Sequence, residues 1–174
     1  MKAKFIALAL MGAAALVVFA HVADAQQDRY ALTLGKLSFG DFRGYENWKV
    51  VAVSRTPKQL KVILANDVMI AAYRSGLPAD GKVFPEGSKV VKLEWGFKRN
   101  TKAPYEVYVP DQLEAIGTIE KDSTRFPDTH GWAYGNFTYA SGTFTPEGND
   151  AKCGYACHTR MASQDYIYTA YPFR

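Results

Sequence analysis

Residues Lys89–Lys98 read KVVKLEWGFK, a run in which apolar and polar side chains alternate. Successive side chains of a β-strand point to opposite faces of the sheet, so such a run builds one apolar face and one mixed face. The apolar face, which belongs in a core, carries Val91, Leu93, Trp95 and Phe97, and the other face carries Val90, Lys92 and Glu94. Lys92 and Glu94 must face either solvent or a polar pocket, and the alternation leaves both open.

Other stretches also have the composition of strands. Runs rich in β-branched and aromatic residues, bounded by Gly, Pro, Asn or Asp, are typical of strands in a sheet. Such runs predict strands over residues 48–54, 60–65, 105–109, 113–120, 131–138 and 165–171, the last of which closes the domain. Residues 141–150 are predicted to form a loop, and residues 30–42 a short helix or loose turns.

One helix is predicted in the middle of the chain, starting at Asn66. Asn66 is a good N-cap, and Asp67 suits the positive end of the helix dipole. Apolar side chains then recur at helical spacing, at Val68, Met69, Ala72 and Tyr73. Gly76 followed by Pro78 forms the usual stop signal.

The first residues have the pattern of a secretory signal peptide. Lys2 and Lys4 form a basic start, residues 5–20 are apolar, and Ala23-Asp24-Ala25 supplies a small-x-small cleavage motif. A membrane anchor needs about 20 apolar residues with suitable flanks, so an uncleaved anchor is the weaker interpretation. We expect residues 1–25 to be removed and residues 26–174 to form one exported domain with no membrane segment.

The net charge and the small number of histidines and cysteines argue against several classes of binding site. The formal net charge is +4 and the charges are interspersed, which argues against a nucleic-acid-binding stripe or a membrane-binding helix. Beyond the signal peptide, the histidines are His130 and His158, and the cysteines are Cys153 and Cys157. A zinc site with several histidines cannot be assembled from this supply.

Residues Cys153–His158 read CGYACH. Two thiols followed by a histidine are typical of c-type haem attachment, in which the thiols add to the porphyrin vinyl groups and the histidine ligates the iron. The usual spacing is C-x-x-C-H, whereas here three residues separate Cys153 from Cys157, so the segment must bulge for both sulfurs to reach. The alternatives are two free thiols or a haem-free exported domain with a Cys153–Cys157 disulfide, whose small loop would gain little from closure.

The supply of iron ligands favours a five-coordinate haem. A bis-histidine haem would require His130 on the face opposite His158. Met161 is three residues from His158 and cannot reach that face, whereas Met69 stays open as the sixth ligand of a simple electron-transfer cytochrome. An iron with an open position binds small ligands.

These elements predict an α+β domain with a mainly antiparallel β-sheet, a mid-chain helix and a short C-terminal helix that bears the haem. Most small c-type cytochromes are instead all-helical. A haem on a β-rich scaffold therefore points away from the ordinary electron carriers.

Short blocks spread over nearly the whole expected domain carry a family resemblance through their order and spacing. The blocks are Trp48–Val51 (WKVV), Ile63–Asp67 (ILAND), Phe84–Gly87 (FPEG), Val91–Trp95 (VKLEW), Lys121–Ser123 (KDS), Gly131–Tyr134 (GWAY), Cys157–Thr159 (CHT) and Asp165–Thr169 (DYIYT). Together they resemble the cytochrome P-460 family, whose members include the cytochromes c′-beta.

The resemblance implies a periplasmic, homodimeric, β-rich protein with one covalently attached haem c. The family's cysteines make thioethers and its histidine is the proximal iron ligand, which implies those roles for Cys153, Cys157 and His158. The name-giving members also cross-link a lysine to the porphyrin. Lys92 stands at the matching place, after the Phe-x-x-Gly turn and before Glu94.

The resemblance also implies small nitrogen species as ligands or substrates. Members with the cross-link are associated with hydroxylamine oxidation, which needs a periplasmic electron acceptor, and c′-beta members bind nitric oxide and other diatomics. Asp122, in the shared Lys-Asp-Ser block, and Glu94, on the Lys92 face, are candidate catalytic carboxylates that could accept protons. The alternatives are that Asp122 caps the next helical turn and that Glu94 pairs with a neighbouring lysine.

Overall fold

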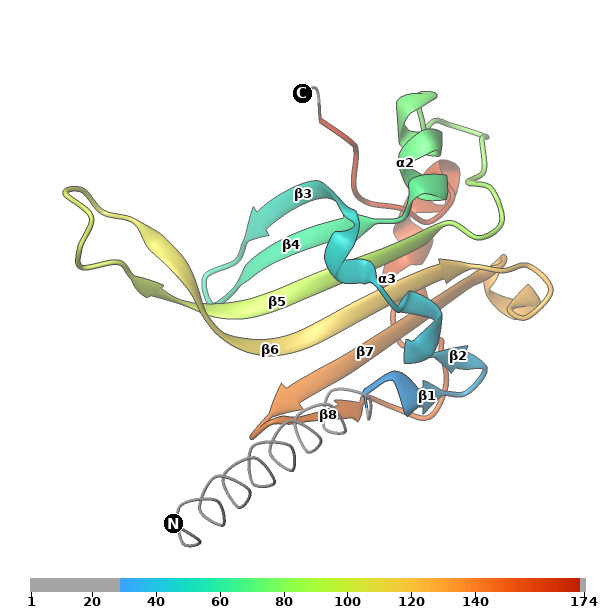
Figure 1. Cartoon of the computed structure of the whole chain (residues 1–174). Helices are drawn as coiled ribbons and strands as arrows, with labels where there is room; N and C mark the ends of the chain where they lie inside the picture. The colour runs from blue at the N-terminus through green and yellow to red at the C-terminus, as the bar shows by residue number, and fades with distance from the viewer. Residues whose placement is uncertain (1–28, 173–174) are drawn as a thin grey trace, which may run out of the picture.

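The computed structural model describes residues 29–172 (Figure 1). The signal peptide predicted for residues 1–25 lies outside this range. Within it, no helix is both long enough and apolar enough to cross a membrane.

A six-stranded antiparallel sheet forms the body of the fold, and its strands pair in the order in which they occur along the chain. The strands are β3 (Lys49–Arg55), β4 (Leu60–Ala65), β5 (Lys89–Arg99), β6 (Tyr108–Lys121), β7 (Trp132–Ala140) and β8 (Thr143–Pro146). A separate two-stranded ribbon consists of β1 (Thr33–Leu34) and β2 (Leu37–Ser38). β5 and β6 project beyond their neighbours as a long hairpin (Figure 1). The predicted α+β class with a mainly antiparallel sheet is confirmed.

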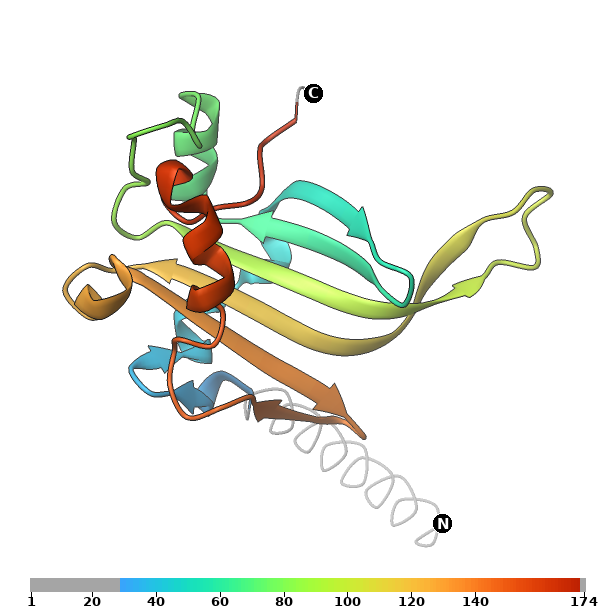
Figure 2. The same cartoon turned by 180° about the vertical axis from the view of Figure 1, so that it is seen from behind.

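Different segments cover the two faces of the sheet. The N-terminal segment lies on one face with its ribbon and three short 3₁₀ turns (Figure 1). These turns are η1 (Arg29–Ala31), η2 (Phe39–Phe42) and η3 (Tyr45–Asn47). The other face is covered by α2 (Asp67–Arg74), α3 (Tyr155–His158), η5 (Thr159–Gln164) and the C-terminal segment (Figure 2). η4 (Pro127–Thr129) lies in the connection from β6 to β7.

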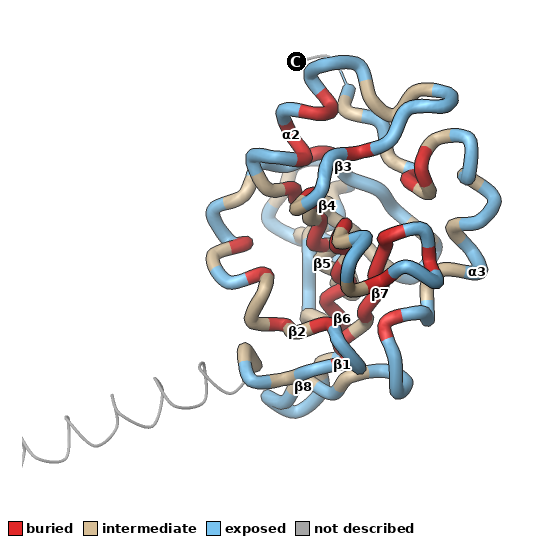
Figure 3. Tube along the Cα trace, turned by 90° about the vertical axis from the view of Figure 1, so that its right-hand side faces the viewer, coloured by how far each residue is buried: buried red, intermediate tan, exposed pale blue. Residues whose placement is uncertain are grey.

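Two buried clusters follow from this layering, one on each face. The N-terminal segment buries Leu37, Phe39 and Phe42 against Val91, Ile116 and Phe137 of the sheet. On the other face, α2 buries Met69, Ile70 and Tyr73 with Val90, Trp132 and Ile167. Because Val90 and Val91 are neighbours in β5, strand alternation sends them into different clusters. Buried positions accordingly concentrate along the strands between the layers (Figure 3).

The mid-chain helix begins where the sequence predicts. The side chain of Asn66 accepts a hydrogen bond from the backbone N–H of Met69 at 3.1 Å, which is N-cap geometry. The same oxygen accepts from the N–H of Lys89, and the amide nitrogen of Asn66 donates to the carbonyl of Gly87. Asn66 therefore joins the start of α2 to the start of β5.

Two predicted strands are one in the structure. Residues 108–121 form the continuous strand β6, whereas separate strands were expected over 105–109 and 113–120. Pro110, which suggested the break, lies where the pairing with β5 changes register beside Trp95 and Phe97. A proline lacks the N–H that a regular ladder needs, and a register shift removes that need.

The strand predicted over residues 165–171 is wrong. Asp165 and Tyr166 both adopt left-handed backbone conformations, with φ of 49° and 64°, and the residues that follow pair with no strand. The alternation that suggested a strand arises because Ile167 is buried and Tyr168 is exposed along an extended tail. Conversely, the loop predicted over 141–150 contains β8, which follows a tight turn at Ser141 and Gly142, both with positive φ.

Phe137→Ala tests the cluster under the N-terminal segment. Phe137 is fully buried, and its ring packs edge-on against Phe39 at 4.8 Å. We expect the variant to lose about 3–5 kcal/mol of unfolding free energy, because the cavity left behind cannot collapse completely. Denaturant unfolding measures the loss. Val53→Ala, at a position that is 71% exposed, is the control; equal losses in both variants would contradict the assignment of this core.

Candidate functional site

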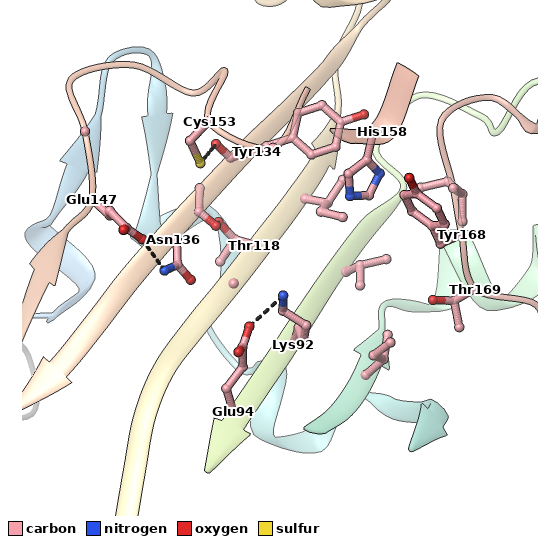
Figure 4. Close-up of a pocket in the computed structure, with 18 of the residues that line it drawn as sticks. Lys92, Glu94, Thr118, Tyr134, Asn136, Glu147, Cys153, His158, Tyr168 and Thr169 are labelled. Carbon is pink, nitrogen blue, oxygen red and sulfur yellow. Dashed lines mark hydrogen bonds and ion pairs between the residues drawn. The ribbon is translucent and has the colours of Figure 1, made fainter. Parts of the chain in front are cut away.

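A cavity of about 600 Å³ lies between the sheet and the segment that carries CGYACH (Figure 4). Its volume falls within the range of about 300–1,000 Å³ that is usual for small-molecule and cofactor pockets. Its floor comes from β4 to β7, and its cover comes from α3 and residues 167–169. Lys92 and Glu94 line it, so the mixed face of β5 borders a polar pocket.

The long side chain of Lys92 reaches the cavity across a glycine. Lys92 of β5 pairs with Gly117 of β6. A Cβ at position 117 would lie 3.0 Å from Cε of Lys92, so a larger residue would compete with the lysine for this space. Gly117 therefore leaves room for the Lys92 stem above β6.

Contacts with β7 place the CGYACH segment over the cavity. Tyr134 donates its backbone N–H to the carbonyl of Ala151 at 2.7 Å and forms a β-bridge with Lys152. Gly154 then passes so close that a Cβ there would lie 2.9 Å from Cβ of Tyr134. The glycine of CGYACH thus allows α3 to lie directly against the sheet.

His158 lies at the end of α3 with its ring in the cavity wall (Figure 4). Its Nδ1 is 2.5 Å from the carbonyl oxygen of Tyr166. A carbonyl only accepts, so Nδ1 carries the proton in this contact and Nε2 keeps its lone pair. Burial lowers the pKa of His158, with the nearby charge of Lys92 acting in the same direction. The ring is therefore neutral and has the tautomer of a metal-ligating histidine.

Two tyrosines restrict the orientation of this ring. The Tyr134 ring lies 4.6 Å from that of His158 and the Tyr168 ring 5.0 Å, the latter edge-on. Tyr168 is itself held, because its hydroxyl donates to the carbonyl of Cys157 at 2.6 Å. The imidazole is therefore fixed by one hydrogen bond and two ring contacts.

The two cysteines differ in their relation to the cavity. Both thiols are free, with no disulfide between them. Cys153 lines the cavity, and its Sγ donates to the carbonyl of Tyr134 at 3.3 Å. Burial raises the pKa of the Cys153 thiol. Cys157 does not belong to the lining, although both cysteines are exposed at the surface.

Glu94, on the cavity floor, pairs with two lysines, of which Lys92 also lines the cavity. Its carboxylate is 2.6 Å from Nζ of Lys92 and 2.9 Å from Nζ of Lys61, and its side chain is only 8% exposed. Burial acts to raise the pKa of Glu94, but the hydrogen bonds and charges of Lys92 and Lys61 outweigh it, and the pKa lies below its usual value. Glu94 is thus an ionised counter-ion, which agrees with the alternative that it pairs with neighbouring lysines.

Asp122 is not brought together with the other candidates. It lies after β6, outside the cavity lining, and its carboxylate accepts from the backbone N–H groups of Thr124 and Arg125 and from the Arg125 side chain. The hydrogen bond from the Arg125 backbone is the main cause that holds the pKa of Asp122 below its usual value. This geometry matches the alternative in which Asp122 caps a turn.

The other candidate iron ligands also lie away from the cavity. Met69 is fully buried in the cluster under α2, and His130 is exposed with its ring stacked on Tyr166 at 5.0 Å. Among the described lining residues, His158 is the one histidine and there is no methionine. A group bound at Nε2 of His158 therefore meets no second His or Met ligand from this lining.

Sequence reasoning missed two lining tyrosines. Tyr73 of α2 and Tyr134 of β7 line the cavity, and within residues 29–172 their buried hydroxyls have no hydrogen-bond partner. Burial raises the pKa of both, so they remain protonated donors. Helical spacing identified Tyr73 as a core residue, but no pattern indicated an unsatisfied hydroxyl. A neutral histidine, a thiol and unsatisfied hydroxyls around a cavity with both apolar and polar walls are a donor set that fits a haem.

The comparison with known families agrees with this geometry. The family model described as Cytochrome P460 matches residues 42–169, which include every residue that lines the cavity. No curated protein matches the chain.

Glu94→Gln tests the charge state of the cavity floor through acid stability. The folded-state pKa of Glu94 lies below the unfolded value, so the carboxylate adds stability that is complete above about pH 4.5 and is lost as the pH falls through the folded pKa. We expect the wild type to lose unfolding free energy between about pH 5 and pH 3 more steeply than Glu94→Gln. Denaturant unfolding across this range measures both slopes. Glu114→Gln, which removes an exposed carboxylate, is the control; parallel slopes for wild type and Glu94→Gln would refute the ionised counter-ion.

Proposed function

We propose that this chain, which belongs to the cytochrome P460 family of haem-binding cytochromes, holds one haem c in its cavity and leaves one axial iron position open to small nitrogen species. His158 would be the proximal ligand, and Cys153 of the CGYACH segment, which lines the cavity, would supply the thioether bond. Such an iron supplies a redox-active position that binds nitric oxide or hydroxylamine.

The single observation that carries the proposal is the hydrogen bond from Nδ1 of His158 to the carbonyl of Tyr166. It leaves Nε2 as the free lone pair and orients the ring within the cavity wall. The same lining offers no second histidine or methionine among the described residues, which supports an open sixth position. A six-coordinate electron carrier ligated by Met69 would require that side chain to leave the core.

The charges of the cavity floor favour ligand binding over turnover. A general base works best when its pKa lies near the working pH. Glu94 has a lowered pKa and is held by Lys92 and Lys61, so it accepts protons weakly. Its role in the proposal is to hold the Lys92 side chain in place in the cavity. Nitric oxide binding is therefore the first candidate function.

Hydroxylamine oxidation is the second candidate, and the position of Lys92 favours it. The family resemblance assigns a porphyrin cross-link to a lysine at this place in the sequence, and Lys92 does line the cavity. Nζ of Lys92 lies 2.6 Å from the Glu94 carboxylate, so a cross-link requires that ion pair to open. An electron acceptor would then take up the electrons that hydroxylamine loses.

The signal-peptide pattern of the first residues supports a proposed location, and the family resemblance supports a proposed assembly. We propose that residues 1–25 direct export to the periplasm, where c-type haem is attached, and that the mature chain forms a homodimer. A periplasmic electron acceptor is the proposed redox partner.

Alanine variants of the two cysteines test the covalent attachment. Cys153 lines the cavity and Cys157 does not, so we expect Cys153→Ala to lose covalent haem and Cys157→Ala to retain it. The variants are co-expressed with the c-type maturation machinery, and the intact mass of the denatured protein shows whether haem is attached. Wild-type protein is the matched control. Covalent haem of wild-type yield in Cys153→Ala would contradict the assignment.

Lys92→Ala separates the two candidate functions. If nitric oxide binding is the function, we expect reduced wild type to bind nitric oxide and not to oxidise hydroxylamine with an artificial electron acceptor. Its haem peptide should then have the mass of thioether attachment without a lysine bond. A lysine-linked peptide and hydroxylamine turnover, both lost in Lys92→Ala, would establish the second candidate instead. Absence of any Soret band in the mature protein would contradict both candidate functions, because each requires a bound haem.

A further inference from the structure

The carbonyl that orients His158 lies in an unusual stretch of backbone. Asp165 and Tyr166 are consecutive residues with left-handed conformations, and neither is glycine. Such residues are uncommon, with aspartate among the more tolerant types, and they persist where the surroundings hold them. This double turn redirects the chain after η5 so that the Tyr166 carbonyl faces Nδ1 of His158.

Asp165 is tied to three other parts of the molecule. Its carboxylate oxygens lie 2.9 and 3.0 Å from Nζ of Lys121, and one of them accepts from the backbone N–H of Phe84 at 2.7 Å. Its own N–H donates to the end of η5. Both charged side chains are nearly enclosed, with 6% of Lys121 and 4% of Asp165 exposed.

Lys121 also contacts His130, whose ring stacks on Tyr166. Its Nζ donates to the carbonyl of His130 at 3.2 Å and lies 4.9 Å from the Trp132 ring. His130 has a left-handed backbone too, and its ring stacks on Tyr166. One lysine thus holds Asp165 through its carboxylate and His130 through its carbonyl, and these two residues flank Tyr166.

We propose that the buried Lys121–Asp165 ion pair positions His158 for iron ligation by holding the Tyr166 carbonyl against Nδ1. Lys121 and Asp165 are positioning residues, because they lie outside the cavity lining and act through Tyr166. The inference rests on the proposed function in one respect, which is that His158 ligates haem iron.

The burial of this pair supports a positioning role over a purely stabilising one. Desolvation makes a buried ion pair weak in net stability, and apolar replacement of a whole pair is often neutral or better. Hydrogen bonds from an outer shell, in contrast, fix the orientation of a ligating histidine and raise its basicity. The pair spans 44 residues of sequence between the end of β6 and the turn after η5, where no regular element fixes the backbone.

Asp165→Asn tests the inference with little change of backbone preference, because asparagine also tolerates the left-handed conformation. In the reduced holoprotein, resonance Raman spectroscopy reports the iron–histidine stretching band. We expect the band to broaden and shift to lower frequency in the variant, because a loosened Tyr166 carbonyl weakens the Nδ1 hydrogen bond. The thermal unfolding midpoint is measured in parallel to separate positioning from stability.

Two further variants keep the test decisive. Asp111→Asn breaks the exposed ion pair between Lys98 of β5 and Asp111 of β6, and its band should match wild type. Lys121→Met/Asp165→Asn removes both buried charges, so no uncompensated charge remains to unfold the chain. We expect this double variant to recover most of the unfolding midpoint and still show the shifted band.

The possible outcomes separate failure of the positioning role from failure of iron ligation by His158. A wild-type band in either folded variant at position 165 would overturn the positioning role and leave the proposed function intact. Absence of an iron–histidine band in wild type, despite bound haem, would overturn ligation by His158 itself. A band shift in both Asp165 variants but not in Asp111→Asn supports the inference.

Discussion

The structure depends on the two-sided character of its central sheet. Because neighbouring side chains of a strand point to opposite faces, β5 delivers Val91 to the N-terminal core and Lys92 to the cavity. Both faces are covered, so the N-terminal segment and the C-terminal segment each complete one layer. The cavity exists because the second layer covers a face that carries Lys92, Gly117 and Glu94 as well as apolar groups.

The candidate site is built by a segment that lies on the sheet without joining it. Gly154 permits the close approach to Tyr134, α3 supplies one turn of helix, and His158 ends that turn. The left-handed turn at Asp165 then brings the chain back over the cavity. His158 is thereby fixed from both directions of the chain, which a single short helix could not achieve alone.

Local sequence patterns predicted the helices and strands well where interactions between residues close in the sequence determine the backbone conformation. The Asn66 cap, the antiparallel sheet and the alternation of β5 as far as Glu94 are confirmed because each depends on neighbours a few residues apart. Trp95 and Phe97, which were expected in the core, belong to neither buried cluster, because the pairing with β6 shifts register beside them. The prediction failed at residues 165–171, where burial alternates without a partner strand, and at Pro110, where a register shift accommodates the proline. Alternating polarity along a segment predicts which side chains are buried. It does not show whether another strand lies beside the segment to form the hydrogen bonds of a sheet.

The sequence by itself determined the fold class, the thiol–histidine segment and the mixed face of β5, because spacing along the chain sets these features. Only the tertiary structure decided that Lys92 and Glu94 face a cavity, that Asp122 does not, and that Cys153 rather than Cys157 lines it. It alone showed the Tyr166 carbonyl at His158 and the buried pair of Lys121 with Asp165. These contacts join residues that share no element, and their geometry depends on how the layers pack.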